Sequence, residues 1–303
     1  MSKAVVLHNS WLEERRGGIG GSDAAAIIGL SRWATPYVVW ADKTGRLPPR
    51  EDTEAMKQGR DLEDYVAARF TEETKKKVRR KNGIIKNPKY PWALANIDRL
   101  VVGEQAGLEC KTTSALNLKR FKNGEYPQEY YVQCVHYLAV TGFKKWYLAV
   151  LVLGRSFEVF EIDRDEDEVA ALMAAEMEFW ENHVLADTPP EVYGEQPTSE
   201  AIKRVYLSSN DDEADISHLR TDIDMLQTLK KGVKEMEKQI ELHEQKIKLA
   251  LGNSTTGRID GYTVEWKPQT RLHLDRRLLI ADYPELDLSQ YENTTEYRKL
   301  TIR

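Results

Sequence analysis

Asp98 and the segment Glu109-Cys110-Lys111 are the residues whose types and order could do hydrolytic chemistry. The run GLECKTT (107–113) is typical of a short strand, and strand side chains alternate between two faces. We therefore expect Glu109 and Lys111 on one face and Cys110 on the other. A carboxylate beside an ammonium, with Asp98 supplied by the preceding turn, can hold a divalent cation and position a water for phosphodiester hydrolysis. The alternative is an exposed Glu-x-Lys strand with an acid nearby, which is common in a chain that is 31% charged.

Two predicted helices carry further polar candidates. Glu63 lies in a helix expected from about residue 51 to 77, near its N-terminal end, where it could point at the same metal centre. An ordinary helix glutamate is the alternative. The segment QEYYVQCVHYLAVT has helical spacing and places Gln133, His136 and Tyr137 on one face, as a polar wall of an active site requires. A histidine satisfied within the core is the commoner explanation for His136.

A glycine cluster near the N-terminus is a candidate anion site. Trp11 and Arg15 precede GGIGGSD, in which Ser22 and Asp23 are expected to cap a helix over the apolar run AAAIIGL. Glycines let a backbone approach a ligand closely, helix N–H groups favour anions, and Arg15 could donate to a phosphate. The run fits neither the Walker pattern nor the dinucleotide-binding pattern. A flexible loop with a capped helix remains the alternative.

Composition limits the class of protein. The 303 residues suffice for one large domain or two smaller ones, each with a sizeable core. A net charge of −5 argues against indiscriminate nucleic-acid binding but is compatible with a local basic groove. Cys110 and Cys134 are the two cysteines, too few for a four-thiolate zinc site or an iron–sulfur cluster. The sequence contains no apolar run of membrane-spanning length and no apparent secretion signal, so we expect a cytoplasmic protein without a membrane partner.

The Pro-rich stretch at 187–200 predicts a boundary between two domains, 1–195 and 196–303. The first shows a mixed α/β pattern. Strands are expected at 83–86, 93–102 and 107–113, followed by a helix at 128–141. A hairpin of strands 146–153 and 156–163 and a helix over 166–185 complete the domain.

The second expected domain is helical. Its apolar residues recur every seven positions, at Leu219, Leu226, Val233, Ile240 and Ile247. This spacing predicts a long helix, or a helical hairpin that turns near Gly232, for packing or association. A small β tail is expected at 258–274.

Taken together, these motifs resemble the YqaJ-type viral recombinase family, relatives of phage lambda exonuclease within the PD-(D/E)XK nuclease superfamily. The resemblance runs from about residue 11 to 191. Its motifs are WLEERRGGIGGSDAAAIIGLSRW, QGRDLEDYVAARF, Asp98 with GLECKT, and YYVQCVHYLAVTG. It implies a central mixed β-sheet flanked by helices, with the active-site strand carrying Glu109 and Lys111.

The resemblance also implies roles around a metal. Asp98 and Glu109 match the main ligands, with the backbone carbonyl of Cys110 completing the site. Glu63 matches a helix carboxylate that helps to hold a second metal or its water. Lys111 matches the residue that orients or deprotonates the attacking water. The implied cofactor is Mg²⁺ or Mn²⁺, with one or two ions per subunit.

Other positions match the surroundings of the metal. Gln133 matches a glutamine beside the metal centre, and Arg15 with Ser22 matches a pair that grips a DNA 5′-phosphate. Asn96 stands where lambda exonuclease has a phosphate-contacting serine, so the grip at that point is expected to differ. Many family members carry a second glutamine where this chain has Val135, to which we assign no role.

The implied activity is 5′→3′ exonuclease action on double-stranded DNA ends. It leaves 3′ single strands for a phage-type single-strand annealing protein in homologous recombination. The resemblance further implies a homo-oligomer, with a trimer favoured, in the cytoplasm of a bacterial host. Two alternatives remain: a PD-(D/E)XK endonuclease, and a non-catalytic scaffold that binds DNA ends.

Overall fold

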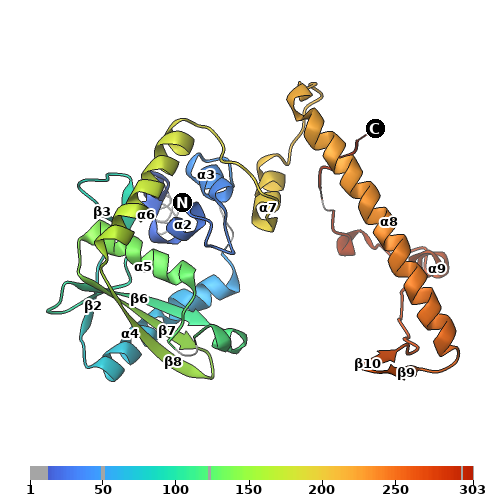
Figure 1. Ribbon diagram of the computed structural model, residues 1–303, viewed down its shortest axis with the longest axis horizontal. Coiled ribbons are helices and arrows are strands. Elements are labelled where there is room, and N and C mark those ends of the chain that lie inside the picture. The colour runs from blue at the N-terminus through green and yellow to red at the C-terminus, as the bar shows by residue number, and fades with distance from the viewer. Residues whose placement is uncertain (1–12, 49–51, 122–123, 295, 303) are drawn as a thin grey trace. The chain divides into compact units, whose positions relative to one another are not determined.

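The computed structural model describes residues 13–48, 52–121, 124–294 and 296–302 (Figure 1). Two compact units are present, Met1–Leu207 and Ser208–Arg303. The division lies C-terminal of the expected boundary at residue 195. The reason is that helix α7 (Gln196–Val205) packs on the first unit, where the hydroxyls of Thr35 and Thr198 hydrogen bond at 2.8 Å.

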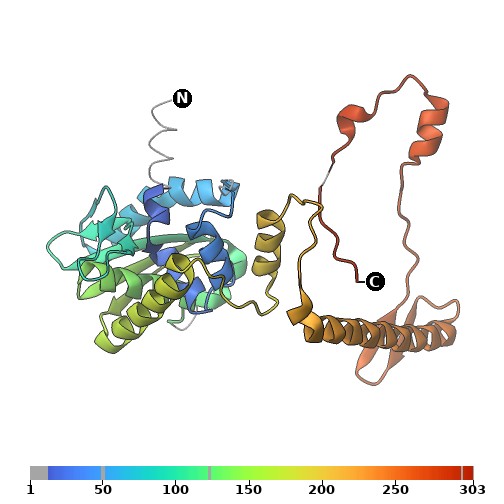
Figure 2. The same ribbon diagram turned by 90° about the horizontal axis from the view of Figure 1, so that it is seen from above.

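A mixed five-stranded sheet forms the centre of the first unit (Figures 1 and 2). Its strands in spatial order are β2 (Val78–Arg80), β5 (Arg99–Val101), β6 (Ala106–Thr113), β7 (Lys145–Val152) and β8 (Ser156–Asp163). β6 and β7 are parallel, and the other neighbouring pairs are antiparallel. The hairpin β7–β8 turns at Gly154, whose φ of 68° is readily adopted by glycine, and this confirms the hairpin expected from the sequence.

Helices cover both faces of this sheet. α4 (Glu54–Thr74) packs on one face, where Phe70 shares a core with residues of β6 and β7. α5 (Gln128–Thr141) packs on the opposite face over Leu148, and α6 (Glu166–Phe179) packs on α5. Burying an apolar side chain of this size contributes roughly 1.5–3 kcal/mol, so the two layers hold the intervening strands firmly. The expected α/β class, a mixed sheet flanked by helices, is confirmed.

A smaller sheet lies beside the first. It consists of β1 (Ile19–Gly20), parallel to β4 (Ala93–Ala95), and of β3 (Ile85–Lys86), antiparallel to β4. The single strand expected over 93–102 is therefore wrong. The chain leaves the small sheet after β4 and enters the large one at β5, and Asp98 lies in the bend between them.

The remaining elements of this unit are helical. α2 (Gly21–Ile27) follows β1 directly and lies against α5. α3 (Pro36–Lys43) begins after Thr35, whose hydroxyl accepts a hydrogen bond from the N–H of Val38 and so caps the helix. Two irregular helical segments are η1 (Ala115–Phe121), which follows β6, and η2 (Trp180–Leu185), which continues α6.

In the second unit, η3 (Ser217–Leu219) leads into the single long helix α8 (Arg220–Leu251), which passes through Gly232 without a break. The long helix is confirmed and the alternative hairpin is wrong. β9 (Thr256–Ile259) and β10 (Tyr262–Glu265) pair as the expected small β tail. They are followed by α9 (Arg276–Asp282) and η4 (Ser289–Tyr291). Within the described ranges of both units, no helix has the length and apolar character needed to cross a membrane.

Candidate active site

Strand β6 positions the central pair of the candidate site. Glu109 and Lys111 project from the same face, toward α5, and the Lys111 ammonium lies 2.6 Å from Oε1 of Glu109. Glu109 is almost completely buried, and the Lys111 side chain is largely covered. Cys110 lies on the opposite face with the core under α4. The expected alternation along this strand is therefore confirmed.

The side chain of Asp98 is held by the backbone of β6. The ladder between β5 and β6 pairs Arg99 with Leu108, and beyond it the N–H of Cys110 donates to Oδ2 of Asp98 at 2.7 Å. The carboxylate thus takes the place that a strand carbonyl would otherwise fill. The result is that Asp98 is brought next to Glu109, as the sequence predicts.

Helix α5 supplies the side-chain amide of Gln133, which holds Glu109 in place. Nε2 of Gln133 donates to Oε1 of Glu109 at 2.7 Å and to the hydroxyl of Tyr137 at 2.8 Å. The Tyr137 hydroxyl in turn donates to the backbone carbonyl of Asn96 at 3.2 Å. One buried chain of hydrogen bonds therefore ties the carboxylate of Glu109 to the segment that carries Asp98. Tyr137, expected from the sequence on the same polar helix face as Gln133, holds both parts together.

Glu63 lies near Asp98, whose pKa its charge helps to raise, but its carboxylate is taken up by another partner. It lies in the middle of α4 rather than near its start, and it forms an ion pair with the buried Arg99. Arg99 also donates to Oδ1 of Asp64 and to the carbonyl of Asp98, both at 2.6 Å. The physical reason is that a buried guanidinium needs carboxylate partners, and the nearest ones are on α4. Arg99 was not singled out from the sequence. Its position directly after Asp98 could have indicated that it lies next to the site.

Negative charge is concentrated around Asp98. Burial and the charges of Glu109 and Glu63 together hold the pKa of Asp98 well above its ordinary value. Burial lowers the pKa of Lys111, but the charges of Glu109 and Asp98 outweigh it and raise the pKa above its ordinary value. Lys111 therefore stays an ammonium ion, while the carboxylates are crowded and repel one another.

This donor set fits a hard divalent cation. Oε2 of Glu109 is buried, and the described part of the chain provides it with no hydrogen-bond partner. Carboxylate and carbonyl oxygens are the ligands that Mg²⁺ and Mn²⁺ prefer. Among the described residues, no three acidic, histidine or cysteine side chains are grouped to hold an ion. The fit consequently depends on Asp98 and Glu109 with the backbone carbonyl of Cys110, and not on Glu63.

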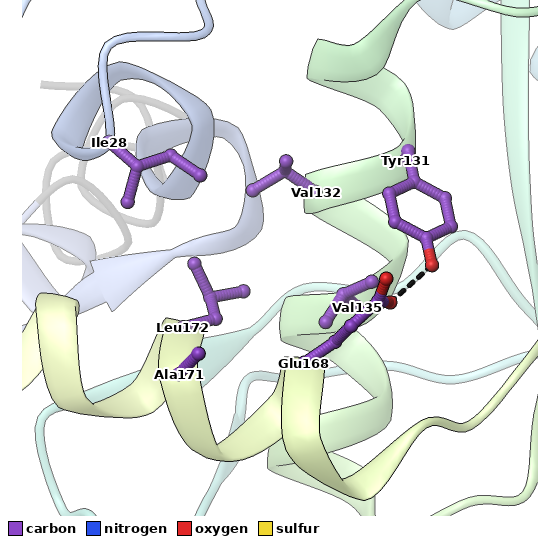
Figure 3. A pocket seen from close by; sticks show the side chains of 7 residues that line it. All are labelled: Ile28, Tyr131, Val132, Val135, Glu168, Ala171 and Leu172. Carbon is purple, nitrogen blue, oxygen red and sulfur yellow. Dashed lines mark hydrogen bonds between the residues drawn. The ribbon is translucent and has the colours of Figure 1, made fainter.

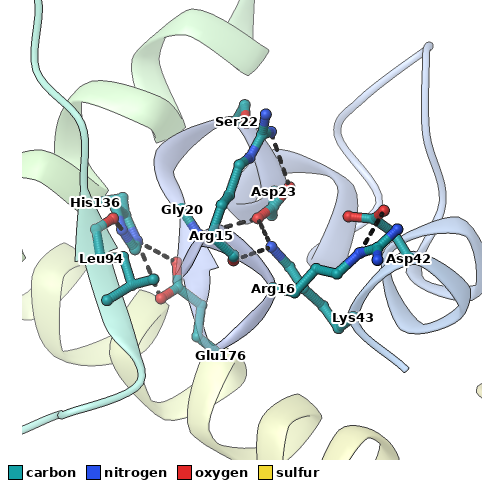
Figure 4. A network of polar contacts seen from close by, with 10 residues as sticks. All are labelled: Arg15, Arg16, Gly20, Ser22, Asp23, Asp42, Lys43, Leu94, His136 and Glu176. Atoms are coloured by element: carbon teal, nitrogen blue, oxygen red, sulfur yellow. Dashed lines mark hydrogen bonds and ion pairs between the residues drawn. The ribbon is translucent and has the colours of Figure 1, made fainter. Parts of the chain in front are cut away.

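The candidate phosphate site is assembled next to α2 (Figure 4). Arg15 donates to the hydroxyl of Ser22 at 2.9 Å, so the two residues expected to grip a phosphate do lie together. Ser22 does not cap the helix as expected, because α2 begins at Gly21 and Asp23 accepts the N–H of Gly20 at 3.0 Å. Trp11 lies outside the described residues. Asn96 is exposed, and its backbone carbonyl accepts the hydrogen bond from the Tyr137 hydroxyl.

Gly21 links the two candidate sites. A Cβ atom placed there would lie 2.7 Å from the ring of Tyr137 and 3.0 Å from Cγ of Gln133. The backbone next to Ser22 therefore touches the same two side chains that brace Glu109. Only glycine permits this close approach, which accounts for one glycine of the cluster.

His136 and Val135 have structural places. His136 is fully buried, with Nδ1 bonded to Glu176 at 2.8 Å and Nε2 to the carbonyl of Leu94 at 2.9 Å (Figure 4). Val135 lines an apolar hollow of about 270 Å³ between α2, α5 and α6, beside the hydrogen-bonded pair Tyr131 and Glu168 (Figure 3). Both residues support helix packing, in agreement with the structural explanation for His136.

The fold and the arrangement of Asp98, Glu109 and Lys111 define a PD-(D/E)XK-type core. Residues 10–144 match the YqaJ-like viral recombinase domain. The uncharacterized protein YqaJ of Bacillus subtilis (strain 168) is 39% identical over 98% of this chain and 95% of its own length. The chain therefore belongs to the YqaJ-like viral recombinase family.

Solved structures show the same fold. An alkaline exonuclease from Laribacter hongkongensis, LHK-Exo, superposes with a TM-score of 0.51 and 22% sequence identity, covering 59% of this chain and 94% of that protein. LHK-Exo in complex with dAMP gives the same values. At this level of identity the likeness concerns the fold.

Proposed function

We propose that this protein is a metal-dependent 5′→3′ exonuclease that degrades one strand of duplex DNA from 5′-phosphorylated ends. The observation that carries the proposal is the buried, unpartnered Oε2 of Glu109 beside Asp98 and the charged Lys111, within the described chain. Membership of a viral recombinase family and the fold of an alkaline exonuclease support it.

Asp98, Glu109 and the carbonyl of Cys110 would hold one Mg²⁺ or Mn²⁺. When bound, such an ion neutralises phosphate charge and lowers the pKa of a bound water. Gln133 donates to Oε1 of Glu109, which leaves the buried Oε2 as the oxygen of this carboxylate that would bind the ion. Because Tyr137 braces both carboxylate segments, the donors need little rearrangement.

Lys111 has a defined protonation state in this scheme. The neighbouring carboxylates raise its pKa, so it remains positively charged at neutral pH and is a poor proton acceptor. We infer that Lys111 orients the water and offsets phosphate charge rather than acting as the base. Preorganised positive charge at such a position commonly contributes about 10²–10³ in rate.

The direction of digestion comes from the phosphate site. The Arg15 guanidinium and the Ser22 hydroxyl, held 2.9 Å apart, suit a terminal phosphate. Gly21 connects them to Gln133 and Tyr137, next to Glu109. A 5′-terminal phosphate bound there would place the neighbouring phosphodiester near the carboxylates. Cleavage would then remove nucleotides from the 5′ end.

Two wider proposals come from the family resemblance. The 3′ single strands would pass to a single-strand annealing protein for recombination, and the protein would act as a homo-oligomer, with a trimer favoured. Light scattering of the full chain tests the second: a monomer at working concentration would remove the oligomer and leave the hydrolytic proposal intact.

The decisive experiment is digestion of linear duplex DNA with a 5′-phosphate or a 5′-hydroxyl, in Mg²⁺ and in EDTA. We expect rapid shortening of the phosphorylated strand in Mg²⁺ only. Lys111→Met should lower the rate at least about 100-fold. Lys145→Met, which removes a partly exposed lysine of β7 that pairs with Glu161, is the matched control and should stay within about twofold.

Three outcomes contradict the proposal. Nicking of covalently closed plasmid would indicate an endonuclease. Digestion in EDTA would remove the metal requirement. DNA-end binding that is retained without any hydrolysis, in the wild type as in Asp98→Ala, Glu109→Ala and Lys111→Ala, would indicate a scaffold.

A further inference from the structure

A buried ion pair lies beneath the candidate phosphate site. The ammonium of Lys43, on α3, lies 2.7 Å from Oδ2 of Asp23, on α2, and the Lys43 side chain is 0% exposed. Taking two charges out of water is costly, and apolar residues of similar size often serve packing equally well. A charged pair at this position therefore calls for a reason other than packing.

Both members of the pair also touch the segment that holds Arg15 (Figure 4). The Lys43 ammonium donates to the backbone carbonyl of Arg15 at 3.1 Å, and Oδ1 of Asp23 lies 3.8 Å from the Arg15 guanidinium. Asp23 also accepts the N–H of Gly20 at 3.0 Å. The backbone and the side chain of Arg15 are thus both fixed by one pair of charges.

The charges of these three residues explain the arrangement. Asp23 brings a negative charge close to Arg15, which by itself would cancel the attraction of Arg15 for an anion. Burial raises the pKa of Asp23, but the attraction of Lys43 and Arg15 outweighs it, so this carboxyl is ionised at neutral pH. With Lys43 present the three residues sum to one positive charge, and without it they sum to zero.

We propose that Lys43 is a positioning residue that neutralises Asp23 and thereby leaves the charge of Arg15 available to a DNA 5′-phosphate. Asp23 orients Arg15 and the glycine backbone, and Lys43 prevents that same carboxylate from repelling the phosphate. The pair therefore sets the preference for phosphorylated over unphosphorylated ends. This inference rests on the proposed exonuclease function.

The test measures the ratio of digestion rates on 5′-phosphorylated and 5′-hydroxyl duplex in Mg²⁺. Lys43→Met, which keeps the length of the side chain, should lower this ratio about tenfold or more, the size of a charge-assisted hydrogen bond. The double variant Asp23→Asn/Lys43→Met restores the net charge and keeps an acceptor for Gly20. It should recover most of the ratio.

Asp42→Asn is the matched control. Asp42 neighbours Lys43 on α3 and faces Arg16 at 4.0 Å in a partly exposed pair, so its removal should change the ratio by less than about twofold. Far-ultraviolet circular dichroism and thermal melting establish that each variant is folded. Anisotropy of labelled duplexes in Ca²⁺, used to suppress cleavage, measures the same preference in binding.

The outcomes separate this inference from the proposed function. If the wild type shows no digestion, the exonuclease proposal itself fails. If the wild type prefers phosphorylated ends and folded Lys43→Met keeps that preference, the role of Lys43 is refuted. If Lys43→Met and the double variant lose the preference equally, charge balance is refuted and the pair only supports the fold.

Discussion

Replacing Asp98 with asparagine should stabilise the metal-free protein while abolishing hydrolysis. Desolvation of the Asp98 carboxyl and the nearby charges of Glu109 and Glu63 together raise its pKa well above the ordinary 3.8. Asparagine keeps an oxygen to accept the N–H of Cys110, which donates at 2.7 Å. The substitution therefore removes a repelled charge and retains the hydrogen bond.

The magnitude follows from the repulsion that is relieved. Removing one unfavourable charge commonly raises the free energy of unfolding by about 0.5–2 kcal/mol, and each kcal/mol shifts the melting temperature of a domain this size by about 2–4 °C. The sign depends on pH. Because the folded pKa is raised, the folded state binds more protons above pH 3.8. The destabilisation by Asp98 therefore grows as pH rises through its folded pKa and is complete above it.

Scanning calorimetry under mildly alkaline conditions, in EDTA and in Mg²⁺, measures this effect. In EDTA we expect Asp98→Asn to melt above the wild type, while Mg²⁺ stabilises the wild type and leaves the variant unchanged. Asp163→Asn, an exposed acid at the end of β8, is the control and should melt like the wild type in both buffers. A lower melting temperature for Asp98→Asn in EDTA would show that the carboxylate stabilises the fold, and the reasoning on crowded acids would be refuted.

Two further predictions concern the helix that carries Ser22. Gly21→Ala should destabilise the protein by about 1–3 kcal/mol in urea unfolding, because its Cβ would lie 2.7 Å from the buried Tyr137 ring. Gly59→Ala in α4, where the nearest atom lies 3.8 Å away, should instead stabilise by about 0.5–1 kcal/mol; equal effects would contradict the close approach at Gly21. Burial raises the pKa of Asp23, but the attraction of Lys43 and Arg15 outweighs it and lowers the pKa below 3.8. The stability that Asp23 contributes is therefore full above pH 3.8 and lost as pH falls through the folded pKa. The urea midpoint should accordingly fall more on acidification in the wild type than in Asp23→Asn/Lys43→Met, and parallel curves would count against this ion pair.

Local patterns predicted much of the first unit. The helix over 128–141 coincides with α5, and the strand expected over 107–113 lies within β6. Both follow from periodicity, because burial on one face repeats every 3.6 residues in a helix and every second residue in a strand. The same alternation placed Glu109 and Lys111 on one face. Such features depend only on residues close together in the chain.

The errors have a different origin. The strand expected at 93–102 divides between two sheets, and a run of apolar residues does not record which neighbour each half will pair with. Ser22 was expected to cap α2, but the glycine before it forms the start of the helix because Gly21 fits against Tyr137. Both outcomes depend on partners supplied by other elements.

Residue types and spacing were enough to nominate Asp98, Glu109 and Lys111, because a carboxylate and an amine on one strand face, with a second carboxylate just before the strand, can hold a divalent cation. Only the folded chain decided how each acid is paired: Arg99 forms an ion pair with Glu63, and Gln133 donates a hydrogen bond to Glu109. Likewise Lys43, which has no signature in the sequence, meets Asp23 only when α2 and α3 pack together. Ion pairs and hydrogen bonds act over a few ångströms in space, whatever the separation of the two residues along the chain. The partners can therefore be identified only from the folded structure.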